Sequence, residues 1–288
     1  MTSPNLKRAQ LDLAYQHCQQ IARKHYENFP VASLLLPAKL RKHVAAVYAF
    51  ARQADDLADE GVADAADRLA ALCNMATTLH DCIDGNATDN PVYLAITHTI
   101  KVFNLPIILF NDLISAFSQD VIKHRYTDFD ELLDYCQRSA NPVGRIMLHL
   151  QGKTDAASLK QSDAICTALQ LINFYQDLYQ DYHEQNRIYI PSQDMQNRGV
   201  TENHFAQVIN DTDMHDLMQL QYRRAAELLN RGAILGNRLS GRFGIEIRLI
   251  IAGGQRILFK LQHQKNCFNR PRLTINDKFW MLYTALLQ

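Results

Sequence analysis

Helix-period hydrophobic patterning recurs along almost the whole chain, and this feature constrains the fold more than any other. Apolar residues return every three to four positions, while Gly and Pro are scarce, with 11 and 8 among 288 residues. No turn dipeptide stands between two alternating apolar stretches, as a β-hairpin would require. The pattern predicts an all-α protein with helices at 11–25, 40–59, 65–83, 90–103, 107–122, 128–138, 143–151, 159–182, 215–239 and 245–262.

The breaks between these segments contain turn-forming residues but no flexible linker. They fall at 30–37, 85–91, Asn141-Pro142, Gly152-Lys153 and 191–199. The chain has no low-complexity tract and no short-period repeat. With 47% hydrophobic residues it can bury one large core. We therefore expect a single all-helical domain over residues 1–288.

Charge and cysteine content argue against several classes of protein. Thirty Lys and Arg balance thirty Asp and Glu, so a nucleic-acid partner is not expected. The six cysteines form no C-x-x-C pair, which argues against a disulfide framework or a zinc site. The N-terminal residues lack the apolar core of a secretion signal, and no apolar run reaches the roughly 20 residues that span a bilayer. We expect a cytoplasmic protein whose membrane contact is at most peripheral, at the inner face.

Three oxygen-bearing side chains, Asn173, Asp177 and Asp181, follow one another at a spacing of four. On an α-helix such residues lie on one face, where the two carboxylates repel each other unless a cation or solvent relieves them. A solvated acidic face is the commoner explanation for an isolated pattern of this kind. Here the apolar run TALQLI, residues 167–172, precedes the motif and favours a carboxylate face beside a buried wall.

A second acidic cluster repeats the first. In YAFARQADDLADEG, residues 48–61, Asp55 and Asp59 stand four apart, Asp56 lies beside them and Arg52 comes one turn earlier. The other face of this segment is rich in Ala, Val, Tyr and Phe. Two carboxylate sets on two apolar helices suggest that both face a shared cavity.

Hard divalent cations suit these side chains. Mg²⁺ prefers oxygen ligands and is commonly held by one or two carboxylates, while phosphate oxygens complete its octahedron. The basic residues Arg52, Arg187 and Lys153 are candidates to contact the same anion. The pattern favours Mg²⁺-dependent binding of a diphosphate as a leaving group, with metal ligands from Asp55, Asp56, Asp59, Asn173, Asp177 and Asp181.

Both motifs, in this order, resemble those of the squalene and phytoene synthases, the head-to-head isoprenyl diphosphate synthases. SLLLP followed by YAFARQADDLADE is similar to the family's Y-A-F-x-R-x-x-D-D-x-x-D block, and QLINFYQDLYQDYHEQNRIYIP to its Q-L-x-N-x-x-x-D-x-x-x-D block ending in R-x-Y-x-P. The resemblance runs from His25 to about Arg272. It implies an isoprenoid synthase helical bundle around a central apolar cavity, Mg²⁺ between both clusters and diphosphate, and a membrane-associated polyprenyl substrate.

Departures from the common family pattern resemble the hydroxysqualene synthase subfamily of bacterial hopanoid biosynthesis. YCQRSANPVG places Arg138 at the usual Tyr and Asn141-Pro142 at the usual Gly-x. HYENFPVAS stands in place of the usual H-x-x-S-F stretch, and AGGQRIL places Gly254 where a Tyr is common. The family's catalytic Tyr is therefore not carried over to this chain.

For this subfamily the resemblance implies that presqualene diphosphate ionises, rearranges and captures water, which gives hydroxysqualene and diphosphate. NADPH is not expected, because no G-x-G-x-x-G fingerprint is present and a water-quenched cation needs no hydride. Pathway enzymes upstream and downstream would be partners. The expected catalytic residues are Asp55, Asp59, Asp177, Asp181, Arg138 and Asn141. The expected substrate contacts are His25, Tyr26, Asn28, Arg52, Tyr48, Phe50, Phe174, Arg187, Tyr189 and Arg272.

Several alternatives stay open. A presqualene diphosphate, squalene or phytoene synthase would condense two prenyl diphosphates head to head, although Arg138 and Gly254 count against it. A non-catalytic assembly or binding relative would be expected to have lost its aspartates. A plain acidic-faced scaffold explains neither the paired motifs nor R-x-Y-x-P. Tyr48, Phe50 and Phe174 are also explained as core aromatics, and Arg138 as half of a surface salt bridge.

Overall fold

The computed structural model describes residues 4–24 and 35–287, and within them the chain forms fifteen helices. No β-strand occurs in this described part, where Arg125 and Ile188 form an isolated bridge. The all-α prediction is confirmed. The chain divides into two compact units, Met1–Ile122 with Ile146–Lys153, and Lys123–Arg145 with Thr154–Gln288. The prediction of a single domain stays a prediction.

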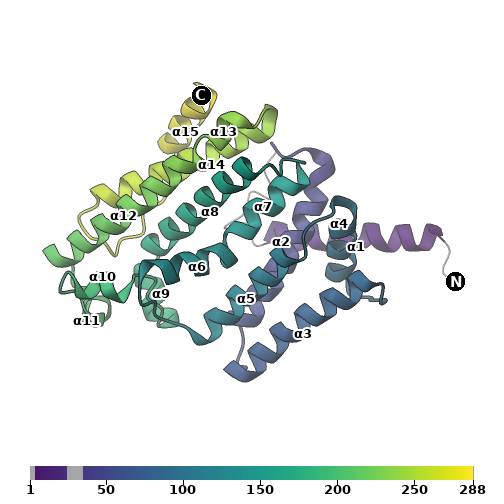
Figure 1. Ribbon diagram of the computed structural model, residues 1–288, viewed down its shortest axis with the longest axis horizontal. Helices are drawn as coiled ribbons and strands as arrows, with labels where there is room; N and C mark the ends of the chain where they lie inside the picture. Colours follow the sequence, from purple (N-terminus) through teal and green to yellow (C-terminus); the bar gives the residue numbers. More distant parts are fainter. Residues whose placement is uncertain (1–3, 25–34, 288) are drawn as a thin grey trace. The chain divides into compact units, whose positions relative to one another are not determined.

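The first unit is organised around α2, which packs against α1, α3, α4 and α5 (Figure 1). Side-chain caps define the helix starts: the Asp64 carboxylate accepts from the Asp67 N–H at 2.9 Å, and Asn90 caps the helix that Pro91 begins. The bounds are α1 (Pro4–Lys24), α2 (Ala38–Asp59), α3 (Ala65–Asp84), α4 (Pro91–Phe103) and α5 (Ile108–Ile122).

A buried polar network ties α1, α2 and α4 together. The Tyr15 hydroxyl contacts Nδ1 of His43 at 3.1 Å, Nδ1 of His98 at 2.8 Å and Oγ1 of Thr99 at 2.9 Å. Burial lowers the pKa of His43 to about 4 and also lowers the pKa of His98. Both imidazoles are therefore neutral at pH 7, so the network fixes three helices without burying a charge.

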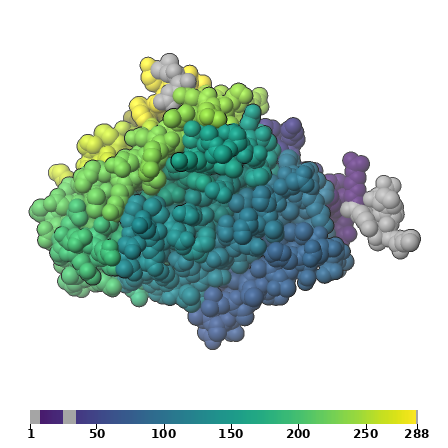
Figure 2. Space-filling model, viewed as in Figure 1, coloured from purple at the N-terminus to yellow at the C-terminus, as the bar shows by residue number. Residues whose placement is uncertain are grey.

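In the second unit, α8 and α12 lie side by side, α14 packs against both, and α15 packs on α14 (Figure 1). The space-filling view shows the side chains of α8 and α12, teal and green, in close contact along this pair (Figure 2). The bounds are α6 (Phe129–Ser139), α7 (Asn141–Leu150), α8 (Ala156–Gln176), α9 (Leu178–Gln185), α10 (Ser192–Gln196), α11 (Glu202–Ala206), α12 (Thr212–Gly232), α13 (Leu235–Arg238), α14 (Gly241–His263) and α15 (Ile275–Leu287). The division between the two units falls inside α7.

Most predicted helices agree with the structure to within a few residues, but the predicted segment 159–182 is not one helix. It is interrupted at Asp177, where φ is −105° and ψ is 15°. The periodicity hides this break because the Asp177 N–H still donates to the Asn173 carbonyl at 3.0 Å, and the Asp181 N–H to the Asp177 carbonyl at 2.8 Å. The predicted segment 215–239 likewise ends at Gly232, and α10, α11 and α15 were not predicted.

Glycines allow α14 to approach its neighbours closely. A Cβ on Gly254 would stand 2.7 Å from Cδ2 of Leu169 in α8 and 3.2 Å from Cδ2 of Leu229 in α12. A Cβ on Gly244 would lie 1.9 Å from the Leu239 carbonyl oxygen, whereas one on Gly253 would meet only flexible side chains. Backbone atoms therefore close the space at Gly244, whereas at Gly254 and Gly253 side-chain ends would have to shift. No helix in the described part of the chain is long and apolar enough to cross a membrane.

We predict that Gly244→Ala destabilises the protein by at least about 2 kcal/mol, because backbone atoms must shift to relieve the contact with Leu239. Gly253→Ala is the matched control in the same helix. It should change stability by less than about 1 kcal/mol, since alanine favours helix and Met281 can move. Urea unfolding of both variants is the measurement, and a Gly244→Ala midpoint equal to that of the wild type would contradict the packing argument.

Candidate active site

The first acidic cluster, Asp55, Asp56 and Asp59, lies in the last turns of α2. The Asp55 and Asp56 side chains are 41% and 39% exposed, and Asp59 is exposed. The carbonyl end of a helix carries partial negative charge, so carboxylates are unfavourable there. The last turn contains no basic residue. This end of α2 therefore favours the binding of a cation.

Arg52 offsets part of this charge within the first unit. Its Nε lies 2.6 Å from Oδ1 of Asp56, its Nη1 lies 3.3 Å from Oδ2 of Asp55, and its Nη2 lies 2.6 Å from Oε1 of Glu60. One guanidinium thus serves three carboxylates. Arg52, which the sequence predicts as an anion contact, is therefore paired with two of the proposed metal ligands, Asp55 and Asp56.

Arg68 fixes the turn that follows the cluster, and sequence reasoning missed it. From α3 it donates to the carbonyl oxygens of Ala58 at 2.7 Å, Gly61 at 2.9 Å and Ala63 at 3.0 Å. The bond to Ala58 satisfies a carbonyl group in the last turn of α2 that has no partner inside the helix, and the other two hold the turn that follows. The sequence shows an Arg near the start of the next helix but not which carbonyls it reaches.

The predicted aromatic contacts on α2 differ from each other in burial. Phe50 is fully buried and packs edge-on against Phe110 and Tyr93, with ring centroids 5.7 and 6.3 Å apart. Phe50 therefore lies in the hydrophobic core, as its explanation as a core aromatic predicts. Tyr48 is partly exposed, and Lys153 is exposed. His25, Tyr26 and Asn28 lie outside the described residues.

The second acidic cluster spans the junction of α8 and α9. Asn173 lies in the last turn of α8, Asp177 at the junction and Asp181 in α9. Asp177 is buried, while Asn173 and Asp181 are half-buried. The backbone hydrogen bonds that bridge the junction keep the spacing of four, so the three residues stay in one helical register.

Arg270 forms an ion pair with Asp177 that the sequence did not reveal. Its Nε lies 2.5 Å from Oδ1, and its Nη2 donates to Oδ2 at 3.2 Å, a bidentate contact between residues 93 positions apart. Burial raises the pKa of Asp177, and the charge of Arg270 opposes that rise. Arg270 lies in NCFNRPRL, residues 266–273, outside both motifs, so only the folded chain identifies it.

Asp181 lies in an environment that disfavours its negative charge. Burial, and then the neighbouring charge of Asp177, raises its pKa to about 8. The charge of Arg187 partly opposes this rise, and the Arg187 backbone N–H donates to the Asp181 carbonyl at 2.8 Å. Without a nearby cation this carboxyl group is largely protonated near neutral pH.

An aromatic cluster adjoins the second acidic cluster. Phe174 follows Asn173 in α8 and stacks on Tyr189, with centroids 3.8 Å apart and planes at 6°. Tyr126 and Tyr135 extend the cluster, at 5.7 Å from Tyr189 and 6.2 Å from Phe174 respectively. All four rings are buried. Sequence reasoning identified Phe174 and Tyr189 but missed the two tyrosines, which belong to neither motif.

Arg138 and Asn141, which depart from the common family pattern, both make polar contacts with neighbouring side chains. Arg138 lies on α6, with Nη2 2.6 Å from Oδ2 of Asp134 one turn earlier. The break predicted at Asn141-Pro142 lies instead at Ala140, because Pro142 is accommodated in the first turn of α7, which Asn141 begins. The buried Oδ1 of Asn141 accepts from the Thr167 hydroxyl at 2.9 Å. Arg272 is exposed, and its positive charge opposes the rise in the pKa of Asp177.

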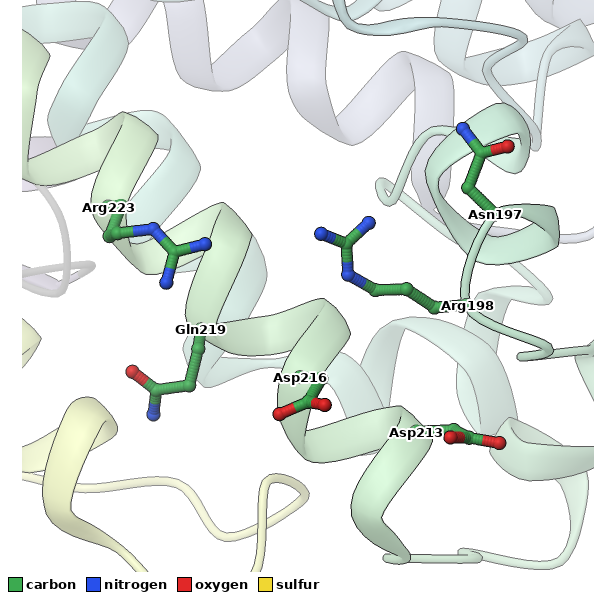
Figure 3. Close-up of a pocket in the computed structure, with 6 residues that line it drawn as sticks. All are labelled: Asn197, Arg198, Asp213, Asp216, Gln219 and Arg223. Carbon is green, nitrogen blue, oxygen red and sulfur yellow. The ribbon is translucent and has the colours of Figure 1, made fainter.

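A polar pocket of about 380 Å³ lies elsewhere in the second unit. Figure 3 shows Arg198 and Arg223 extending toward each other across it. Its charged lining does not suit a long apolar chain, and none of the described residues predicted from sequence is among those that line it. The lining residues are Asn197, Arg198, Asp213, Asp216, Gln219 and Arg223.

The side chains of the two acidic clusters suit a hard cation more than a soft one. Among the described residues, no three or more His, Cys, Asp and Glu side chains form a ready-made metal site, and all six cysteines are free. Carboxylates at the negative end of α2, and Asp181 with its raised pKa, nevertheless fit a hard cation. Mg²⁺ suits this donor set, because it keeps several waters and takes further ligands from phosphate.

Comparison with known proteins agrees with these observations. The Squalene/phytoene synthase family pattern matches residues 22–277. The hydroxysqualene synthase of Zymomonas mobilis is 37% identical over 227 residues, 78% of this chain and 75% of that protein. The hydroxysqualene synthase of Rhodopseudomonas palustris is 33% identical over 248 residues, 86% of this chain and 83% of that protein.

A solved structure supports the same assignment. The crystal structure of squalene synthase HpnC from Alicyclobacillus acidocaldarius matches with a TM-score of 0.84 at 36% identity, and the match covers 91% of this chain and 97% of that one. The sequence resemblance and the all-helical fold are thereby confirmed together. The chain belongs to the squalene/phytoene synthase family.

Proposed function

We propose that this enzyme converts presqualene diphosphate and water into hydroxysqualene and diphosphate. The bond between carbon and the diphosphate oxygen breaks, the cation rearranges, and a water molecule adds to it and loses a proton. The proposal rests above all on two intact aspartate clusters in a chain 37% identical to a hydroxysqualene synthase. NADPH has no role in this reaction, because water rather than hydride quenches the cation.

The aspartate clusters would hold Mg²⁺ ions together with the diphosphate. The proposed ligands are Asp55, Asp56, Asp59, Asn173, Asp177 and Asp181. When bound, Mg²⁺ supplies Lewis-acid stabilisation of the negative charge that develops on the leaving group. Substrate and metal would bind together, since diphosphate oxygens supply the ligands that the protein side chains do not.

The arginines of the two clusters change partners in this scheme. Arg52 and Arg270 neutralise carboxylates of the clusters in the structure described here. Once cations bind these carboxylates, each guanidinium is available to donate to diphosphate oxygens. Arg187 and Arg272, whose charges act on Asp181 and Asp177, are proposed as further anion contacts.

Aromatic and amide groups would control the cation and the water. The rings of Phe174 and Tyr189 offer an apolar surface with π-faces that favour positive charge. The carbonyl oxygen of Asn141 is engaged by Thr167, so its NH₂ group is proposed to orient the quenching water. Arg138 cannot serve as a general base, because a guanidinium stays protonated, and it would instead retain diphosphate after ionisation.

A C30 substrate also implies a long apolar binding site and a lipid-soluble supply. Each buried CH₂ contributes about 0.8 kcal/mol, so the hydrocarbon rather than the diphosphate dominates the gross binding energy. Peripheral contact of a cytoplasmic enzyme with the inner face of the membrane is part of this proposal. Enzymes that supply presqualene diphosphate and consume hydroxysqualene would act before and after it.

We predict that purified enzyme with Mg²⁺ converts presqualene diphosphate into hydroxysqualene at the same rate with and without NADPH. Product analysis by mass spectrometry is the measurement, and chelation of Mg²⁺ should reduce the rate to background. Farnesyl diphosphate alone should give no presqualene diphosphate. Efficient formation of presqualene diphosphate in that second assay would overturn the assignment in favour of a condensing enzyme.

We predict that Arg138→Tyr lowers the hydroxysqualene yield at least about tenfold, which corresponds to about 1.4 kcal/mol of lost transition-state stabilisation. Asn141→Gly should shift products from alcohol toward hydrocarbon, because the quenching water loses its orienting amide. Arg238→Tyr is the matched control, since it also removes an exposed Arg–Asp ion pair, here with Asp155 at 3.0 Å. Unchanged yields in both test variants, with normal thermal unfolding, would remove these residues from the mechanism.

We predict that Arg270→Gln strengthens Mg²⁺ binding in the absence of diphosphate, because the cation no longer competes with a guanidinium for Asp177. The same variant should bind diphosphate with Mg²⁺ more weakly than the wild type does. Isothermal titration calorimetry measures both affinities. Asp177→Asn should abolish turnover, and thermal unfolding separates this effect from the stability lost with the Arg270 ion pair.

Arg242→Gln is the control for this prediction, because Arg242 is an exposed arginine of α14 that no described contact links to the acidic clusters. It should leave both affinities unchanged. If Arg270→Gln behaved like Arg242→Gln in both titrations, the ion pair would have no part in metal or diphosphate binding.

A further inference from the structure

Positive charge is concentrated at the C-terminal end of the sequence. The chain as a whole is neutral, but residues 241–288 contain eight Arg and Lys and only two carboxylates, a formal net charge of +6. Both carboxylates, Glu246 and Asp277, are buried. The accessible charge of this region is therefore basic, and Arg242, Lys265, Arg272 and Lys278 are all exposed.

The outer face of α15 is apolar instead of polar. Ile275, Phe279, Leu282, Tyr283 and Leu286 are 71%, 67%, 47%, 67% and 68% exposed. At 3.6 residues per turn these five positions fall within an arc of about 100°. Single exposed apolar side chains are ordinary, but a contiguous stripe marks a surface that binds something.

Buried polar contacts lock α15 in this orientation. Asp277, on the opposite face, lies 2.5 Å from both Nε of Arg256 and Nζ of Lys260, and its Oδ2 accepts from the Thr274 N–H at 2.7 Å. The Ala285 carbonyl accepts from Nε of Arg248 at 2.7 Å. Rotation that buried the apolar stripe would expose Asp277 and separate these charges. The packing against α14 thus holds the stripe outward.

We propose that α15 lies in the headgroup region of a bilayer that contains anionic lipid, with its apolar stripe toward the acyl chains. With 13 residues, a length of about 20 Å, the helix is too short to span a bilayer but can lie in its plane. Trp280 and Tyr283 are the side chains that interfaces favour, and Lys278 borders the stripe. Lys278 would contact lipid phosphates.

Charge favours lipid over a second copy of the chain as the occupant. In a two-fold dimer through α15, two regions with an excess of positive charge would meet, and like charges would oppose association. An anionic bilayer offers the complementary charge and an apolar interior at the same surface. This inference deepens the peripheral membrane contact of the proposed function by naming the surface that makes it, and it does not depend on the proposed reaction.

The chain provides its own probe, because Trp280 is its only tryptophan. The experiment mixes purified protein, without substrate, with vesicles of phosphatidylcholine alone or with added phosphatidylglycerol. Sedimentation measures the bound fraction, and Trp280 emission reports insertion. We expect binding to the anionic vesicles that weakens with salt, a blue shift, and quenching by brominated acyl chains.

Phe279→Glu and Leu286→Glu should each lower the affinity for anionic vesicles at least about tenfold, since each places a charge in the stripe. Val102→Glu, at a 52% exposed position of α4, is the matched control and should bind as the wild type does. Lys278→Gln should weaken binding to anionic vesicles only. Circular dichroism melts verify folding, and Phe279→Ser repeats the test if a Glu variant unfolds.

Three results would overturn the proposal. They are no binding by the wild type, equal binding by the stripe variants and the control, or a concentration-dependent dimer that Phe279→Glu dissociates without any lipid binding. Activity on detergent-solubilised presqualene diphosphate is measured separately. Lipid binding without that activity would overturn the proposed reaction alone. Activity without lipid binding would overturn this inference and the proposed membrane contact but leave the proposed reaction intact.

Discussion

The need to neutralise buried aspartates determines much of the second unit. Asp177, Asp194 and Asp277 are each buried, and an unpaired charge in such a place costs several kcal/mol. Arg270 pairs with Asp177, Arg224 with Asp194, and Arg256 with Asp277. The first of these pairs joins residues 93 positions apart, so it also fixes the segment after α14 against the junction of α8 and α9. Fold and candidate site therefore share the same electrostatic requirement.

The sequence predicts helices well where a single periodicity decides the outcome. The bounds of α3, α4 and α5 follow from apolar spacing, caps and Pro. The junction at Asp177 escapes this reasoning, because its i to i−4 hydrogen bonds continue while its dihedral angles leave the helical range. The helix α15 was also not predicted. Sequence reasoning expects a surface helix to expose its polar face, whereas α15 exposes its apolar face.

Some residues of the candidate site could likewise be predicted from the sequence, and others could not. The aspartates and Asn173 are recognisable because their spacing and family motif are local in the sequence. Arg68 and Arg270 act through contacts that only the folded chain creates, and no local pattern distinguishes them from other surface arginines. Phe50 illustrates the opposite problem, since a motif position with the expected residue type lies in the hydrophobic core.

The glycine at position 254 shows how a departure from a family pattern acquires a physical meaning. In sequence it is only a missing Tyr. In the structure, Leu169 and Leu229 occupy the space that any side chain there would need. A larger residue requires these leucine side chains to shift. The substitution is therefore linked to the packing of side chains from α8 and α12 against α14 as well as to the loss of a hydroxyl group.

The aspartates at the end of α2 have a consequence for protein engineering. Stabilisation by design commonly replaces acidic residues near a helix C-terminus with Lys or Arg, because the helix dipole favours positive charge there. Applied to Asp55, Asp56 and Asp59, that rule would make a more stable helix and remove a proposed metal site in the same step. A stabilised variant of this protein should keep α2 unchanged and gain its stability at other helix ends.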